Sequence, residues 1–170
     1  MTEIDKNSLL KALNYSFKKF LEKDVILINN NNYELTISGR FAMYLRECFI
    51  GLEQQNIFVD VEYNKYGFAD KKRHIQDDIS SGNIRPDIIL HERCSQNNNL
   101  LYCEIKKNVD KNNIDREKVK EQVKDKKYKF GLFVNKMNEK QIDFQIYVNN
   151  NWVEYFYILK TNEIVEITNE

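Results

Sequence analysis

Two apolar segments near the middle of the chain constrain its fold most. Residues 84–91 and 100–107 have the length and composition of strands, and the polar stretch ERCSQNNN joins them. We therefore expect a long antiparallel hairpin. Each segment nevertheless carries charge, because Asp87 follows the single proline of the chain and Glu104 and Lys106 stand two residues apart.

Strand geometry predicts where these charges point. Side chains alternate between the faces of a sheet, so Glu104 and Lys106 share one face and Cys103 and Ile105 share the other. Burying an isolated carboxylate or ammonium group is costly, so partners are expected beside them. If the two strands are neighbours, Asp87 faces the same cleft.

The remaining periodicities predict helices around a mixed sheet. Apolar residues recur with helical spacing in three segments, each of which predicts a helix. The first is residues 4–23, and the second runs from a cap at Thr36 or Ser38 to about Gln55. The third, within residues 112–125, has only a thin apolar stripe of Ile114, Val119 and Val123. Further strands are expected at residues 57–64, 128–135, 141–148, 152–159 and 164–167. Asn149 to Asn151 have the composition of a turn, which predicts a C-terminal β-hairpin. The order indicates an α/β or α+β sandwich of helices on a mixed sheet.

Composition limits the class of protein. A chain of 170 residues with 42% hydrophobic residues fits one domain, residues 1–170. Its 26 basic and 26 acidic residues balance, so any contact with nucleic acid must come from a local patch. Three cysteines without CxxC spacing, and no leader segment, favour the reducing cytoplasm. No apolar run approaches the roughly 20 residues that span a bilayer, so no membrane contact is expected.

Two carboxylates in one cleft indicate a divalent metal. Asp87 and Glu104 would repel each other, and a cation with oxygen ligands, such as Mg²⁺, removes that repulsion. The alternative is an ordinary ion pair of these acids with Lys106, because structural ion pairs imitate functional sites.

Pro86-Asp87 in one strand, followed by Glu104-Ile105-Lys106 in the next, resembles the signature of the PD-(D/E)XK nuclease superfamily. The stretches GRFAMYL, VDVEYNKYG, RPDIILHER and NLLYCEIKK also resemble small stand-alone bacterial and phage members. The resemblance covers about residues 33–135 and implies a restriction-endonuclease-like core of order α-β-β-β-α-β. The C-terminal hairpin lies outside it.

The resemblance also implies roles for individual residues. Asp87, Glu104 and the backbone carbonyl of Ile105 would hold Mg²⁺, or Mn²⁺, and Lys106 would position the attacking water. The superfamily commonly adds a helical glutamate, for which Glu34 fits best. Its rivals are Glu47 and Glu53, and its alternative role is that of a solvated residue near a helix start. Glu62 is expected behind the site without a direct role, and His74 and His91 are expected as bystanders, with His91 near the cleft.

Basic residues around the motif predict a nucleic-acid contact. Residues 106–129 hold twice as many basic as acidic residues, although such a surface is more often only solvated. The candidates for phosphate contact are Lys71, Lys72, Arg73, Lys107, Lys118, Lys124, Lys126 and Lys127. Tyr63, Tyr66 and Phe68 have the spacing of packed strand residues, so no base recognition is inferred.

We therefore expect a metal-dependent nuclease that hydrolyses phosphodiester bonds of DNA. One alternative is a catalytically silent module of the same fold that binds nucleic acid or a partner protein. Another is an enzyme that uses the acidic pair for acid–base chemistry. Cutting both strands would be served by a two-fold homodimer, but the sequence leaves the oligomeric state open.

Overall fold

The computed structural model describes residues 4–30, 33–63, 65–66, 69–70, 85–95, 97–109, 113–126 and 128–168. Its helices are α1 (Lys6–Lys23), α2 (Ile26–Asn29), α3 (Glu34–Phe49), α4 (Ile114–Lys126) and the 3-10 helix η1 (Ile50–Gln55). Its strands are β1 (Ile57–Val61), β2 (Lys65–Tyr66), β3 (Ala69–Asp70), β4 (Ile88–Glu92), β5 (Asn99–Ile105), β6 (Phe130–Met137), β7 (Gln141–Val148), β8 (Asn151–Ile158) and β9 (Glu163–Glu166).

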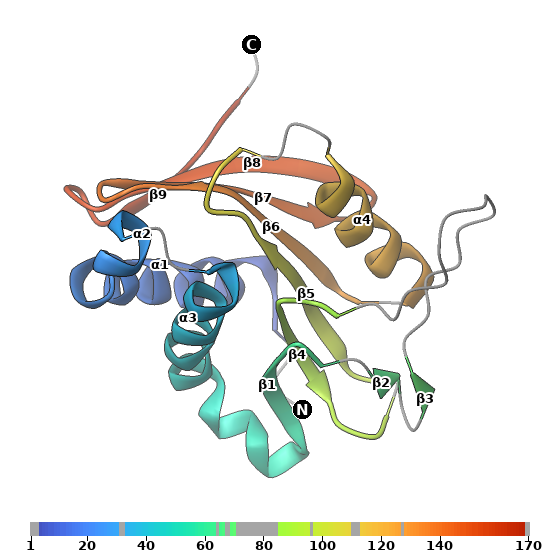
Figure 1. The fold of residues 1–170 in the computed structure, drawn as a ribbon. Helices are drawn as coiled ribbons and strands as arrows, with labels where there is room; N and C mark the ends of the chain where they lie inside the picture. Colours follow the sequence, from blue (N-terminus) through green and yellow to red (C-terminus); the bar gives the residue numbers. More distant parts are fainter. Residues whose placement is uncertain are drawn as a thin grey trace.

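Seven strands form one mixed sheet in the order β1-β4-β5-β6-β7-β8-β9, and β2 pairs with β3 separately. Strands β5 and β6 are parallel, because α4 carries the chain back across the sheet between them. The other neighbours in the large sheet are antiparallel. Figure 1 shows α1, α2 and α3 on one side of the sheet and α4 on the other. The predicted α/β class and the mixed sheet are thus confirmed.

The larger core lies between the sheet and helices α1 and α3. The ring of Phe17 stacks on Phe41 with centroids 5.1 Å apart and lies 5.1 Å from Phe144 of β7. All three side chains are fully buried. Burying one such side chain contributes about 1.5–3 kcal/mol, so this contact fixes α3 against the sheet.

A smaller core holds α4 on the opposite face. Val119 packs there with Ile89, Tyr102, Tyr128 and Phe133. The helix approaches β6 closely, because a Cβ atom added to Gly131 would lie 2.4 Å from Val119 Cγ1 and 2.9 Å from Val123 Cγ2. Glycine at this position therefore sets the height of α4 above the sheet.

Several predicted boundaries need correction. Helix α3 begins at Glu34 with extended Tyr33 as its N-cap, so the prediction of a cap at Thr36 or Ser38 was wrong. The Ser38 hydroxyl instead donates to the Glu34 carbonyl inside the first turn. Ile114 is 51% exposed, so the predicted apolar stripe of α4 does not include it. The first turn of α4 is held by its charged side chains instead, as described below.

The strand predictions are largely confirmed. Strands β4 and β5 form the expected antiparallel hairpin, but β4 begins at Ile88, so Asp87 lies just before it. Strands β7 and β8 form the C-terminal hairpin, and Asn149 and Asn150 turn the chain with φ of 50° and 64°. Asparagine tolerates this left-handed region better than most residues.

The described helices include none that is both long and apolar enough to cross a membrane. The three cysteines, Cys48, Cys94 and Cys103, are free thiols.

Candidate active site

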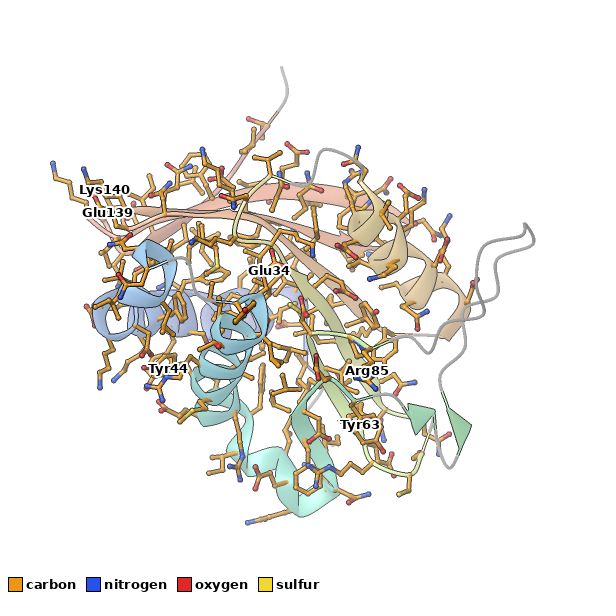
Figure 2. All side chains as sticks on the ribbon, viewed as in Figure 1. Glu34, Tyr44, Tyr63, Arg85, Glu139 and Lys140 are labelled. Atoms are coloured by element: carbon orange, nitrogen blue, oxygen red, sulfur yellow. The ribbon has the colours of Figure 1, made fainter. Side chains whose placement is uncertain are left out.

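Six ionisable side chains meet where β5 ends, and they come from α3, β5, α4, the residue before β4 and the residue after β5. We call them the acid–lysine cluster: Glu34, Asp87, Glu104, Lys106, Asp115 and Lys118. The register pairs Ile88 with Cys103, which brings the preceding Asp87 opposite Glu104. Figure 2 shows Glu34 at the end of α3 that faces the middle of the sheet. Asp115 and Lys118 come from the first turns of α4.

Asp87 is tied to the backbone of β5. Its Oδ2 accepts a hydrogen bond of 2.7 Å from the N–H of Ile105, the residue after Glu104. Burial raises the pKa of Asp87 to about 6, although this bond and Lys106 lower it in part. The carboxylates of Glu34 and Asp115 raise it further. The Asp87 carboxyl is therefore held rigidly in a region that already carries negative charge.

Glu104 is the most deeply buried acid of the cluster. Its side chain faces α4, as strand alternation predicts, while Cys103 and Ile105 lie in the larger core. Oε1 of Glu104 accepts a hydrogen bond of 2.8 Å from the Tyr102 hydroxyl, and Nζ of Lys118 lies 3.7 Å away. Burial, and then the charge of Asp87, raise the pKa of Glu104 to about 8. Without a further cation, ionising this carboxyl is costly at neutral pH.

Lys106 bridges the first turns of two helices. Its Nζ lies 3.0 Å from Oε2 of Glu34 on α3 and 2.9 Å from Oδ2 of Asp115 on α4. Its N–H donates to the carbonyl of Val134, so the parallel ladder with β6 fixes the backbone there. Burial lowers the pKa of Lys106, but the bonds to Asp115 and Glu34 outweigh it and hold that pKa above its ordinary value. Lys106 therefore remains charged.

Asp115 is the residue of the cluster that sequence reasoning missed. Its Oδ2 contacts Lys106, and its Oδ1 lies 2.5 Å from Nζ of Lys118, three residues further along α4. Burial raises the pKa of Asp115, but the hydrogen bonds from Lys118 and Lys106 outweigh it, so that pKa lies below its ordinary value. The signal available was an acid and a lysine three residues apart at the start of the helix that follows the Glu-Ile-Lys strand.

The structure distinguishes the glutamates that the sequence left as rivals. Glu34 reaches Lys106, and its Oε1 also accepts from the N–H of Lys107. Glu47 instead accepts a hydrogen bond from Tyr15, and Glu53 pairs with Arg46. Glu34 is thus the helical glutamate that the fold brings to the cluster.

The backbone of Glu62, rather than its side chain, contacts a residue of the site. Strand β1 ends at Val61, and Glu62 has a φ of 49°, so the expected strand alternation does not extend to it. Its N–H lies 3.3 Å from the carbonyl oxygen of Asp87, while its side chain is exposed.

The side chain of His91 on β4 contacts Asp60 on the neighbouring strand β1. It is 3% exposed, its Nε2 lies 3.0 Å from Oδ2 of Asp60, and its ring packs against Tyr63. Arg93 also binds Asp60. Burial raises the pKa of Asp60, but the bonds from Arg93 and His91 hold it well below its usual range. Asp60 of β1 therefore binds two side chains from the region of β4, and the charges of these residues are satisfied by one another.

The predicted phosphate-binding residues lie in three places: outside the described residues, at the acid–lysine cluster, and further along α4, which ends at Lys126. Lys71, Lys72, Arg73, His74 and Lys127 lie outside the described residues, as does Phe68. Lys107 and Lys118 lie at the cluster, and Lys124 is exposed on α4. Lys118 is a cation beside Glu104, because its Nζ lies 3.7 Å from Oε1 of that residue.

The side chains available to bind a metal at the acid–lysine cluster are few. Within the ranges described above, no three side chains of His, Cys, Asp or Glu are grouped so as to hold a metal ion. Mg²⁺ commonly binds one or two carboxylates and completes its shell with water and substrate phosphate. Asp87 and Glu104 are two such carboxylates, and burial and mutual repulsion raise the pKa of Glu104. A cation between them would offset both effects, so the donor set fits Mg²⁺.

Comparisons of the chain with protein-family models, with curated proteins and with solved structures found no match. The fold and site define an α/β protein with one buried and several partly buried charged side chains, carboxylates and lysines, at the end of a central strand.

Proposed function

We propose that this protein is a Mg²⁺-dependent phosphodiesterase of the PD-(D/E)XK type that cleaves DNA. The order α3, β1, β4, β5, α4, β6 supports this proposal, because it is the order that the sequence resemblance implies. The observation that carries it is the meeting of Asp87, Glu104 and Lys106 with Glu34 at one end of β5.

The charge balance of the acid–lysine cluster supports a divalent cation. The cluster holds four carboxyl groups and two ammonium groups, so full ionisation leaves two excess negative charges. One Mg²⁺ would balance them. Asp87, Glu104 and the carbonyl of Ile105 would hold the ion, and Mn²⁺ would suit the same oxygen donors.

The chain would contribute positioning and positive charge. Bound Mg²⁺ would supply a water of lowered pKa and would neutralise phosphate charge. Lys106 would orient that water and stabilise the charge that develops on the phosphate. Glu34 and Asp115 hold the Lys106 ammonium from two helices, so its position is fixed before substrate arrives.

Purified protein should cleave linear, nicked or single-stranded DNA when Mg²⁺ or Mn²⁺ is added, and EDTA should stop the reaction. An RNA of the same sequence tests the preference for DNA. Asp87→Asn should remove cleavage, whereas Glu53→Gln, which alters a surface pair with Arg46, should leave it intact. A folded protein that cleaves none of these substrates with either metal would rule out the proposal.

A second candidate is a nuclease-like module that binds nucleic acid without cutting it. The observation in its favour is that Lys106 and Lys118 already partner the carboxylates of the cluster without any added cation. Calorimetric titration separates the two candidates. DNA binding with no uptake of Mg²⁺ or Mn²⁺ would favour the silent module.

A further inference from the structure

Lys118 lies inside the acid–lysine cluster rather than on an open groove. Its Nζ is 2.5 Å from Oδ1 of Asp115 and 3.7 Å from Oε1 of Glu104, and 26% of its side chain is exposed. The ammonium group therefore lies beside the expected metal ligand.

Asp115 places two ammonium groups on one small anion. Its Oδ2 lies 2.9 Å from Nζ of Lys106, and its Oδ1 contacts Lys118. A phosphodiester likewise offers two non-bridging oxygens on one centre, and these oxygens share one negative charge. The two lysines are thus already spaced to meet neighbouring oxygens of a single compact anion.

Lys118 also retains the capacity to bind a ligand. An ammonium group has three N–H donors. Lys118 donates to Asp115, while its distance of 3.7 Å from Glu104 exceeds an ordinary hydrogen bond. Donors therefore remain for a further oxygen atom, and the partial exposure of the side chain gives that atom access.

We propose that Lys118 is a second lysine of the site, which contacts the scissile phosphate together with Lys106, and that Asp115 is the positioning residue for both lysines. This inference rests on the proposed function and deepens it. It differs from a general contact with the DNA backbone because it places Lys118 at the reacting phosphate, where loss of the lysine lowers kcat.

The same helix supplies a matched control. Lys120 pairs with Glu117 at 2.9 Å through the spacing that joins Lys118 to Asp115, but its partner is a 46% exposed side chain instead of a 14% exposed one. Variants of Lys120 and Glu117 therefore change the charge and helix contacts of α4 equally, without touching the cluster.

The experiment measures steady-state cleavage of DNA in saturating Mg²⁺ by wild type, Lys118→Met, Lys118→Arg, Asp115→Asn, Lys120→Met and Glu117→Gln. Lys118→Met should lower kcat by about a hundredfold, the usual cost of removing one preorganised donor, with a small change in KM. Lys118→Arg should recover part of this loss. Asp115→Asn should lower kcat without abolishing binding of a fluorescent oligonucleotide in Ca²⁺, and the two control variants should match wild type.

Each outcome decides a separate question. If wild type cleaves and Lys118→Met behaves like Lys120→Met, the inference is overturned and the proposed function stands. If Lys118→Met changes only KM and the salt dependence of binding, Lys118 is a backbone contact and the inference is again overturned. If wild type cleaves no substrate, the proposed function fails and the inference fails with it. Thermal unfolding of every variant identifies any loss of kcat that reflects unfolding. If Lys118→Met is unfolded, the kcat of Lys118→Arg decides the question.

Discussion

The Nζ atom of Lys106 lies 2.9 Å from Oδ2 of Asp115, which joins the end of β5 to the first turn of α4. The same ammonium reaches Glu34 on α3, so one side chain connects helices from both faces of the sheet. Lys106 is therefore a structural tie as well as the proposed catalytic lysine, and an experiment must separate the two roles.

Lys106→Met should separate them. The variant should still bind Mg²⁺, because the proposed ligands remain, but cleavage should fall by orders of magnitude that added metal does not restore. Stability should fall by only about 1 kcal/mol, since both ion pairs are partly exposed and Asp115 keeps Lys118 as a partner. Calorimetric Mg²⁺ titration, steady-state kinetics and chemical denaturation measure metal binding, kcat and stability.

Full rescue of cleavage by Mg²⁺ in Lys106→Met would show that Lys106 only neutralises the carboxylates. Lys140→Met, at an exposed lysine, controls for the loss of charge.

Glu104→Gln should abolish metal-dependent cleavage while the fold persists. Glutamine keeps the size of the side chain and can accept from the Tyr102 hydroxyl, but it removes the charge that would bind the metal. Glu154→Gln is the control, because Glu154 also lies on a strand and accepts a hydrogen bond from a side chain, that of Gln145. Turnover equal to wild type in Glu104→Gln would remove Glu104 from the mechanism.

The metal-free protein should lose stability as pH rises from about 5 to about 8. The pKa of Glu104 rises from 4.5 to about 8 on folding, and that of Asp87 rises from 3.8 to about 6. In this window the folded state holds more protons than the unfolded state, so the free energy of unfolding decreases with pH. The carboxyls whose pKa is lowered by folding, such as Asp60 and Asp115, gain their stabilising effect at lower pH.

Denaturant unfolding at several pH values in EDTA measures this dependence. Glu104→Gln should flatten most of it and should be more stable than wild type at pH 9. Added Mg²⁺ should stabilise wild type more at pH 9 than at pH 5, because ligands bind the metal in their deprotonated form. Stability that rises with pH across this window in EDTA would contradict the high pKa of Glu104.

Local patterns in the sequence predict much of this fold, and tertiary contacts account for most of the errors. The alternation around Glu104 predicts that Cys103 lies on the opposite face of the sheet, and Cys103 is indeed in the larger core there. The asparagines predict the turn of the C-terminal hairpin. Asp115 was missed because its role depends on packing that brings α4 beside the end of β5, which no local period encodes.

The helix starts show the same limit. Thr36 and Ser38 are good capping residues, but the helix extends back to Glu34, whose side chain reaches Lys106. The apolar spacing of Ile114 fits the α4 stripe, yet the ion pairs of Asp115 hold the first turn so that Ile114 remains exposed. In both places an interaction between distant residues overrides the local preference.

Gly131→Ala should destabilise the protein by about 1–3 kcal/mol, the usual cost of overpacking a core. The new methyl group would lie 2.4 Å from Val119 Cγ1, so α4 must lift from β6. Lifting α4 also moves Asp115 and Lys118, which should lower kcat in any cleavage assay. Gly39→Ala is the control: no atom lies within 4 Å of its added Cβ, and alanine should stabilise α3 by about 0.5–1 kcal/mol.

Val119→Ala combined with Gly131→Ala should cost less than the sum of the two single changes, because removing the valine methyls makes room for the alanine. Additive losses in denaturant unfolding would show that the contact with Val119 does not set the height of α4.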